Sequence, residues 1–201
     1  LVRAARRPLV IAGGGVIYSK ACEALARLAA QTGMPVGETQ AGKGSLAFDH
    51  PQNLGAIGVT GTPGANLAAR NADLVIAVGT RLSDFTTASK TAFQNPEVRF
   101  LNINVNEMDA AKHAGLAVIA DARVALEQLE GALAGYRVDD AYARQIAAWK
   151  AAWEQETDRL LNLRHGPPIS QAEVIGAVNR VSRPEDVVVC AAGSLPGDLH
   201  K

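Results

Sequence analysis

The sequence lacks the patterns that mark several large classes of protein. Basic and acidic side chains are equal in number, so the formal net charge is zero, which removes the electrostatic reason to expect nucleic acid or an anionic membrane as a partner. The longest apolar runs, such as residues 74–79, are far shorter than the roughly 20 residues that cross a bilayer. No long apolar stretch follows the charges of the N-terminus, so no signal peptide is expected.

Cysteine is also scarce, with two residues in the chain, Cys22 and Cys190. They fall on a predicted helix and a predicted strand. We therefore expect two buried free thiols in a reducing compartment rather than a disulfide. The cytoplasm is the expected location.

Runs rich in Val, Ile and Leu alternate with Ala-rich stretches of helical spacing. This alternation predicts an α/β fold with a doubly wound parallel sheet. The run at 73–79 is apolar almost throughout, which indicates a strand buried on both faces. A glycine-rich stretch at 42–64 has little periodicity, and its length indicates a binding or interface loop. The predicted strands are 8–12, 34–39, 73–79, 100–105 and 116–120, and the predicted helices are 20–32, 65–71 and 121–133.

The pattern changes after residue 137. Trp149 and Trp153 lie about one turn apart on a long predicted helix, and their stripe favours packing onto a neighbouring domain over a ligand site. A break at 164–168 follows. Ser170 and Glu173 then have the spacing of a capping box, which predicts a helix to about Val181.

Residues 187–190 predict one further strand, and the turn after it begins near Ala191. A single strand without partners is not a stable unit. The first residue is Leu1, and residues 1–6 resemble the tail of a helix. We therefore expect a piece of a longer enzyme: a central domain over 1–137, a linker helix over 138–168 and a truncated second α/β domain over 169–201.

Several short motifs resemble known sites but lack a required residue. Gly13 and Gly15 follow a strand, as in a dinucleotide-binding turn, but the third glycine position is occupied by Tyr18. Glu38 ends the second strand, where an acid that binds ribose would lie. Tight-turn glycines beside a surface carboxylate are the favoured interpretation of this pair of features.

Two catalytic motifs are rejected for similar reasons. Residues 37–43 match a phosphate-binding loop, but Gly44 replaces the hydroxyl residue that would hold magnesium. Ala192 replaces the glycine that a nucleophile turn around Ser194 requires. The histidines show no metal-ligand spacing and are interpreted as surface or packing residues: His50, His113, His165 and His200.

The turn at 193–198 follows a predicted parallel strand at its carboxyl end, where such sheets bind ligands. Exposed backbone N–H groups at this place could hold a phosphate. An ordinary strand–helix turn explains the same residues equally well.

Five stretches taken together resemble the central domain of thiamine-diphosphate-dependent enzymes, the superfamily of acetolactate synthase and pyruvate oxidase. Residues 38–90 and 191–199 are most similar to the ring-opening hydrolases of myo-inositol breakdown within that superfamily. The resemblance covers essentially the whole chain. Its stretches are 8–15, 38–44, 55–61, 65–66 and 72–84.

The resemblance implies a cytoplasmic enzyme that needs thiamine diphosphate and Mg²⁺ and that hydrolyses a C–C bond of a cyclic 1,2-dione, trihydroxycyclohexanedione, to 5-deoxy-glucuronate. It implies a homo-oligomer, a dimer or a tetramer, acting on a small molecule. It places the activating glutamate and the magnesium motif outside this chain, so no catalytic residue is assigned and the chain alone is expected to be inactive. The implied cofactor-binding residues are Gly193, Ser194, Leu195, Pro196, Gly197 and Asp198.

Some relatives bind FAD in the central domain, and the matching positions here are 13–15, 61–66 and Arg81. Flavin-binding relatives tend to carry aspartates where Asn104 and Asn106 stand, so FAD is not expected. Three alternatives remain open: an acetolactate synthase-like carboligase, a stand-alone nucleotide-binding module, and a structural domain that only orients its neighbours.

Overall fold

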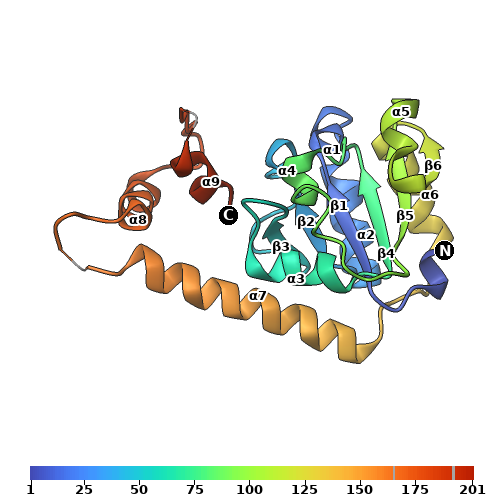
Figure 1. Ribbon diagram of the computed structural model, residues 1–201, viewed down its shortest axis with the longest axis horizontal. Helices are drawn as coiled ribbons and strands as arrows, with labels where there is room; N and C mark the ends of the chain where they lie inside the picture. Colours follow the sequence, from blue (N-terminus) through green and yellow to red (C-terminus); the bar gives the residue numbers. More distant parts are fainter. Residues whose placement is uncertain (165, 192) are drawn as a thin grey trace.

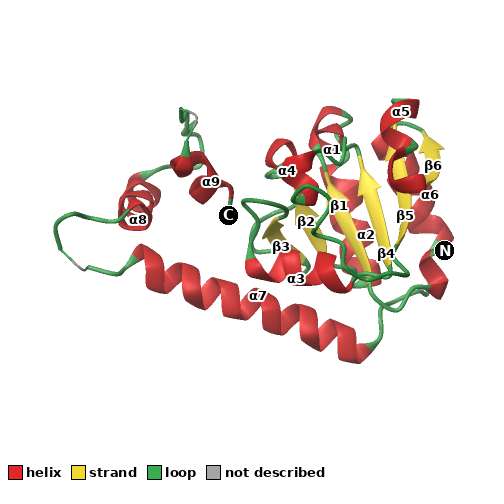
Figure 2. Ribbon diagram, viewed as in Figure 1, coloured by secondary structure: helices red, strands yellow, loops and turns green. Residues whose placement is uncertain are grey.

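The computed structural model describes residues 1–164, 166–191 and 193–201. A six-stranded parallel sheet has the order β3-β2-β1-β4-β5-β6 and carries helices on both faces (Figures 1 and 2). The predicted α/β class with a doubly wound parallel sheet is confirmed. The strands are β1 (Pro8–Ala12), β2 (Val36–Glu38), β3 (Asn53–Ala56), β4 (Leu74–Val78), β5 (Arg99–Asn104) and β6 (Leu116–Ile119).

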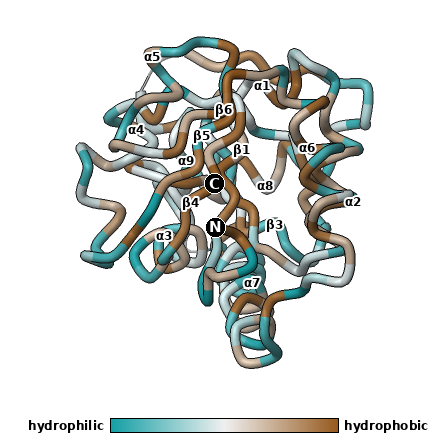
Figure 3. Tube along the Cα trace, turned by 90° about the vertical axis from the view of Figure 1, so that its right-hand side faces the viewer, coloured by the Kyte–Doolittle hydropathy of each residue, from teal (hydrophilic) through white to brown (hydrophobic). Residues whose placement is uncertain are grey.

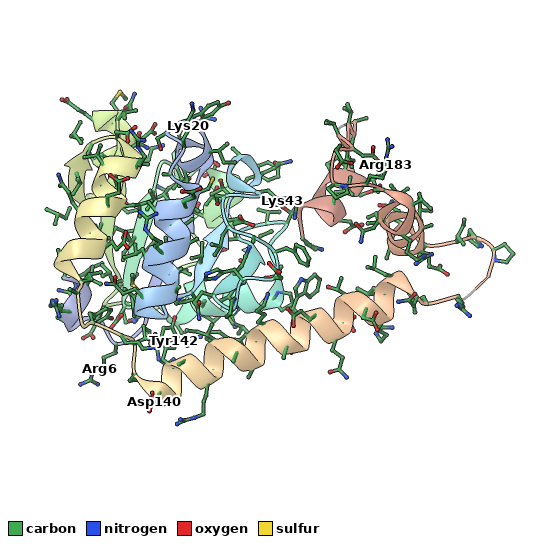
Figure 4. The ribbon with its side chains drawn as sticks, turned by 180° about the vertical axis from the view of Figure 1, so that it is seen from behind. Arg6, Lys20, Lys43, Asp140, Tyr142 and Arg183 are labelled. Atoms are coloured by element: carbon green, nitrogen blue, oxygen red, sulfur yellow. The ribbon has the colours of Figure 1, made fainter. Side chains whose placement is uncertain are left out.

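The helices form two layers around this sheet. α2 and α6 pack against each other on one face, and α3 lies on the other with α7 alongside it (Figures 1 and 4). The α-helices are α1 (Gly14–Tyr18), α2 (Cys22–Thr32), α3 (Pro63–Asn71), α4 (Asp84–Thr87), α5 (Glu107–Ala110), α6 (Ala122–Ala132), α7 (Asp140–Leu161), α8 (Gln171–Val181) and α9 (Ser194–His200). The short 3-10 helices are η1 (Val2–Ala4), η2 (Gln40–Gly42) and η3 (Lys112–Ala114).

The central strands β1 and β4 are buried at every residue, as their apolar runs predict. They pair in register from Pro8 with Leu74 to Ala12 with Val78. From β1 the chain proceeds outward to β2 and β3, and then returns to add β4 on the other side of β1. In doubly wound sheets, ligands bind at the carboxyl ends of the strands where the strand order reverses in this way.

The long helix α7 joins this core through its first half. Asp139 accepts a hydrogen bond from the Tyr142 backbone N–H at 2.8 Å and so caps the helix. The buried Tyr142 hydroxyl donates to the Pro8 carbonyl at 3.2 Å, and burial raises the pKa of Tyr142. Trp149 packs against the core next to Gly64 of α3. The packing interpretation of this tryptophan is confirmed, whereas the domain boundary at residue 137 stays a prediction.

Lys150 connects α7 to the long loop between β2 and β3. Its Nζ donates to the Phe48 carbonyl at 2.9 Å and to the Asn53 carbonyl at 3.4 Å, while the Glu154 carboxylate lies 3.0 Å away. The Lys150 side chain is largely buried at this contact. Its ammonium group therefore satisfies one carbonyl group of the loop and one at the start of β3.

We expect Lys150→Met to lower the free energy of unfolding by about 1–2 kcal/mol, because the apolar stem remains and the charged hydrogen bonds are lost. Urea denaturation followed by circular dichroism measures this change. Arg159→Met is the matched control, since Arg159 forms an exposed ion pair with Glu156 on the same helix, and such pairs contribute little. Equal effects of the two substitutions would contradict the role given to Lys150.

Two expectations from the sequence are wrong at the C-terminal end. The predicted strand at 187–190 is not formed: Val187 and Val189 are 85% and 90% exposed, and no described strand lies beside them to complete a ladder. The predicted turn at 193–198 is mostly helical, because α9 begins at Ser194. His165 and Ala192, which belong to the predicted break and turn, lie outside the described residues.

Smaller differences occur elsewhere. The glycine-rich stretch contains a short strand, β3, that the sequence did not predict. Within residues 1–6, which resemble the tail of a helix, Val2–Ala4 form a short 3-10 helix. Both cysteines are free, but Cys22 is only partly buried and Cys190 is exposed. Cys190 is exposed because it belongs to the predicted strand that did not form. In the described part of the chain, no helix has the length and apolar character that crossing a membrane requires.

Candidate functional site

The loops that follow β1 and β4 touch through their backbones at the point where the strand order reverses. The Gly13 N–H donates to the Val78 carbonyl and the Gly15 N–H donates to the Gly79 carbonyl, each at 2.9 Å. A Cβ atom on Gly13 would lie 2.3 Å from the Gly79 oxygen. The glycines therefore permit a close approach of two loops, and the Gly15 N–H is already used within the protein.

A cavity of about 590 Å³ opens above this contact, at the carboxyl edge of the sheet. We call it the carboxyl-edge cavity. Among the described residues that line it, Arg81 carries a full positive charge and none carries a carboxylate. Its lining comprises Gly14, Gly15, Tyr18, Thr39, Gln40, Ala41, Ile57, Thr60, Gly79, Thr80, Arg81, Ser83, Phe85, Thr86 and His200.

Two aromatic side chains stand at this cavity, and the sequence did not single them out as site residues. Tyr18, which occupies the third position of the imperfect glycine motif, is 90% exposed. Phe85 is also exposed and follows β4. A cavity with a mixed polar and apolar lining, one cation and aromatic flanks has the chemistry to hold an anionic ligand with a flat ring. Of the FAD-related positions, the turn at 13–15 and Arg81 meet here, while residues 61–66 do not line the cavity.

Glu38 has neither of the roles considered from the sequence. Its side chain is 4% exposed, so it is not a surface carboxylate, and it faces inward rather than toward a ribose site. One carboxylate oxygen accepts hydrogen bonds from Gly44 N–H at 3.1 Å, Ser45 Oγ at 3.1 Å and Leu46 N–H at 3.0 Å. The other lies 3.4 Å from Asn53 Nδ2. Glu38 therefore holds the loop whose first residues form one wall of the cavity.

The end of α9 closes the cavity beside this loop. Lys43 Nζ donates to the His200 carbonyl at 2.8 Å, and His200 Nδ1 lies 2.9 Å from Thr60 Oγ1 (Figure 4 labels Lys43). The His200 ring is 4% exposed. Burial, and secondarily the charge of Lys43, lowers its pKa. Burial also lowers the pKa of Lys43, against the opposing charge of Glu38.

Of the other described histidines, His50 and His113 do not line the carboxyl-edge cavity. His200 is a packing residue, as interpreted from the sequence, and His113 stacks on Phe100 with ring centroids 4.7 Å apart. Lys43 is the last residue of the rejected phosphate-binding motif, and its ammonium group donates to the His200 carbonyl of α9. In the described ranges, no group of three or more His, Cys, Asp or Glu side chains is arranged to hold a metal ion.

Asn104 and Asn106 organise the loop that carries Arg81. Asn104 Nδ2 donates to the Thr80 carbonyl at 3.0 Å, and its Oδ1 accepts from the Asn106 N–H at 3.0 Å. Asn106 Oδ1 in turn caps α5. An aspartate at position 104 has no N–H to donate to Thr80. Asn104 therefore has a structural role in this chain, because its side chain joins the Thr80 carbonyl to the Asn106 N–H.

The predicted cofactor-binding residues lie on α9 and directly before it. Gly193 has a φ of 143°, with open space where a Cβ would stand. Ser194 Oγ is 3.1 Å from Gln171 Nε2, Gly197 packs against Thr60, and Asp198 lies 3.6 Å from Lys201 Nζ. Leu195 and Pro196 are exposed and partly exposed. The segment thus stands beside the carboxyl-edge cavity through Thr60.

Comparison with known proteins agrees with this architecture. Residues 1–129 match the family model described as "Thiamine pyrophosphate enzyme, central domain". The chain is 44% identical, over 225 aligned positions, to proteins named 3D-(3,5/4)-trihydroxycyclohexane-1,2-dione hydrolase from Bacillus cereus strain AH820, Bacillus anthracis and Bacillus thuringiensis strain Al Hakam. All of this chain is covered, but only 35% of each relative. The chain therefore belongs to the thiamine pyrophosphate enzyme family and contains its central domain.

Proposed function

We propose that this chain is part of a thiamine-diphosphate-dependent hydrolase that cleaves a C–C bond of a cyclic 1,2-dione, converting trihydroxycyclohexanedione to 5-deoxy-glucuronate in inositol breakdown. The observation that supports this proposal is the 44% identity along the entire chain to relatives named for that substrate. The chain spans about a third of their length. The reaction is accordingly proposed for the whole protein.

Thiamine diphosphate, when bound, supplies the electron sink for the carbanion that C–C cleavage leaves. Residues 193–198 would form one side of its site. They fit that place in part, since the segment is accessible and Gly193 adopts a backbone conformation that favours glycine. Within 193–198 there is no basic side chain. The charge of the diphosphate would have to be balanced by Mg²⁺ and by groups beyond these residues.

The rest of the chain would act as a scaffold. The sheet and α7 hold the loops around the carboxyl-edge cavity in place, and α9 contacts those loops through Lys43 and Thr60. In this proposal the central domain positions the cofactor-binding segment and keeps water from one side of it. No residue of this chain is proposed to transfer a proton in the reaction.

A nucleotide-binding module is the second candidate, because the carboxyl-edge cavity lies where doubly wound sheets bind nucleotides. Arg81 and the aromatic flanks favour it. The Gly15 N–H weighs against a pyrophosphate at the first turn, since it donates to Gly79. Titration calorimetry of the chain with FAD and with NAD tests this candidate, and micromolar affinity for either would favour it over the scaffold role.

An activity assay separates the reactions. We expect the whole protein containing this chain to consume the cyclic dione only when thiamine diphosphate and Mg²⁺ are present, with the acyclic acid as product. The 201-residue chain alone is expected to show no turnover. Formation of acetolactate from pyruvate, without consumption of the dione, would replace the proposal by the carboligase alternative.

A further inference from the structure

Two side chains from the loops of the sheet hold the C-terminal end of α9. Lys43 Nζ donates to the His200 carbonyl at 2.8 Å, and Thr60 Oγ1 lies 2.9 Å from His200 Nδ1. Thr60 also packs against the middle of the helix, since a Cβ on Gly197 would lie 3.0 Å from Thr60 Cγ2. Figure 4 shows Lys43 between the loops of the sheet and α9. We call the pair Lys43 and Thr60 the α9 clasp.

Lys43 makes its contact with a largely desolvated cation. Burial lowers the pKa of its ammonium group, and the charge of Glu38 opposes this effect only in part. The ion pairs formed among the described residues all involve other side chains. An ammonium group that leaves water needs a compensating partner, and the His200 carbonyl supplies one. The contact is therefore a charge-assisted hydrogen bond, which is stronger than a neutral one.

The backbone on both sides of Lys43 is fixed at the carboxyl edge of the sheet. A Cβ on Gly42 would lie 2.2 Å from the Ala12 oxygen, at the end of the apolar strand β1. Figure 3 shows the hydrophobic colours gathered in the central strands. On the other side, the Gly44 N–H donates to the Glu38 carboxylate at 3.1 Å. Lys43 therefore extends from a backbone that close packing and a hydrogen bond hold in place.

Thr60 extends from a backbone that is fixed in a similar way, in the turn before α3. The Gly58 N–H donates to Asn66 Oδ1 at 3.0 Å, and Asn66 Nδ2 donates to the Gly58 carbonyl at 2.9 Å. The Gly61 N–H donates to the same carbonyl at 2.9 Å and closes the turn. Two ordered loops thus direct one side chain each toward the same residue of α9.

We propose that Lys43 and Thr60 are positioning residues that act through α9 on the binding of thiamine diphosphate. This proposal rests on the proposed function, in which residues 193–198 form one side of the cofactor site. From Ser194 to His200 an α-helix rises about 9 Å, so fixing its last residue also restrains its first turn. Without the clasp, the cofactor would have to order α9 when it binds, and the cost of that ordering weakens binding.

Lys43→Met in the whole protein tests the clasp, because it keeps the apolar stem and removes the ammonium group. Without cofactor, hydrogen–deuterium exchange in residues 194–200 should become at least about fivefold faster, while β1 and β4 keep their protection. Calorimetric titration with thiamine diphosphate in excess Mg²⁺ should show about tenfold weaker binding, because one charge-assisted hydrogen bond is lost. At saturating cofactor, turnover of the cyclic dione should stay within about twofold. Lys43→Arg should restore most of the affinity, since a guanidinium also donates to a carbonyl.

Two further variants make the test specific. Thr60→Val removes the hydroxyl and should also weaken cofactor binding. Combined with Lys43→Met, it should cost less than the product of the two single effects, because both residues act on His200. Lys150→Met is the matched control, since Lys150 is a largely buried lysine that donates to main-chain carbonyls outside α9. It should lower stability and leave both the exchange of α9 and the cofactor affinity unchanged.

The outcomes separate the clasp from the proposed function. Unchanged exchange in residues 194–200 of Lys43→Met overturns the proposal, and so does faster exchange with unchanged cofactor affinity. An equal loss of affinity in Lys150→Met overturns it as well, because lower stability would then explain the effect. A whole protein that binds no thiamine diphosphate contradicts the proposed function and the cofactor role of the clasp together. If the cofactor binds but the dione is not consumed, only the assigned reaction fails, and the affinities still decide on the clasp.

Discussion

Gly13→Ala is expected to lower the free energy of unfolding by about 4 kcal/mol or more, close to the total stability of many domains. The added Cβ would lie 2.3 Å from the Gly79 oxygen and 2.6 Å from Thr80 Cβ. Because the first of these contacts is with backbone, no side-chain rotation relieves it. Relief requires the loops after β1 and β4 to separate, which breaks the hydrogen bonds that join them.

Urea denaturation followed by circular dichroism measures this loss, and Gly131→Ala is the matched control. A Cβ on Gly131 meets no atom within 4 Å, and Gly131 lies in α6 without a positive φ. The control is expected to gain about 0.5–1 kcal/mol from helix propensity. A Gly13→Ala variant less than about 1 kcal/mol below the unsubstituted protein would show that the loop contact is not tight.

Glu38→Ala is expected to cost about 3–5 kcal/mol. The substitution leaves the Leu46 N–H and the Ser45 hydroxyl without their buried acceptor and removes the partner of the more exposed Gly44 N–H, while the Asn53 amide keeps the Leu46 and Ala47 carbonyls. Unsatisfied buried donors are costly. The loop from Thr39 to Ala47 should also become sensitive to proteases, because its backbone loses the group that organises it. Denaturation and limited proteolysis together measure both effects.

Two control variants separate the buried role from a general effect of losing a glutamate. Glu38→Gln keeps an oxygen that can accept three of the four hydrogen bonds, and should cost about 1–2 kcal/mol. Glu107→Ala removes an exposed glutamate, and should change stability little. If Glu38→Ala behaved like Glu107→Ala, the carboxylate would not be the centre of the loop.

The parts of the fold that the sequence predicted are those set by local pattern. The apolar runs of β1 and β4 can only be satisfied by burial on both faces, and the Ser170–Glu173 capping box forms as its spacing predicts. The family followed from motifs that lie in the central sheet and its loops. These features depend on neighbours in sequence or on a whole buried face, so the amino-acid sequence alone is enough to predict them.

The features that escaped prediction depend on contacts between distant segments. β3 is a four-residue strand with a glycine inside, and it exists because β2 lies beside it. The local sequence around Glu38 is compatible with binding a ribose and with binding its own loop. The choice depends on residues 44–46, which fold back and donate hydrogen bonds to the Glu38 carboxylate. Residues 187–190 have strand propensity but no partner strand in the described part of the chain. Propensity alone does not produce a ladder.

The candidate site divides in the same way. Gly15 could be selected from the sequence because it follows a predicted strand in a glycine-rich turn, and Arg81 because it matches a position of flavin-binding relatives. Tyr18 and Phe85 could not, since an exposed aromatic residue on a helix of one turn has no pattern that distinguishes it. The role of residues 193–198 in cofactor binding stays a prediction, because its test requires the cofactor.

The place of β1 also bears on how the protein is made. Of the strands of this sheet, β1 is synthesised first, and it can pair early because its partner Val36 follows Val10 closely in the chain. Its other neighbour, β4, arrives only when Leu74 can pair with Pro8. Until then the apolar strand β1 has one open side. Pairings between distant segments form slowly and expose nascent chains to aggregation. We therefore expect the sheet of the nascent chain to be most prone to aggregation after β2 has left the ribosome and before β4 has.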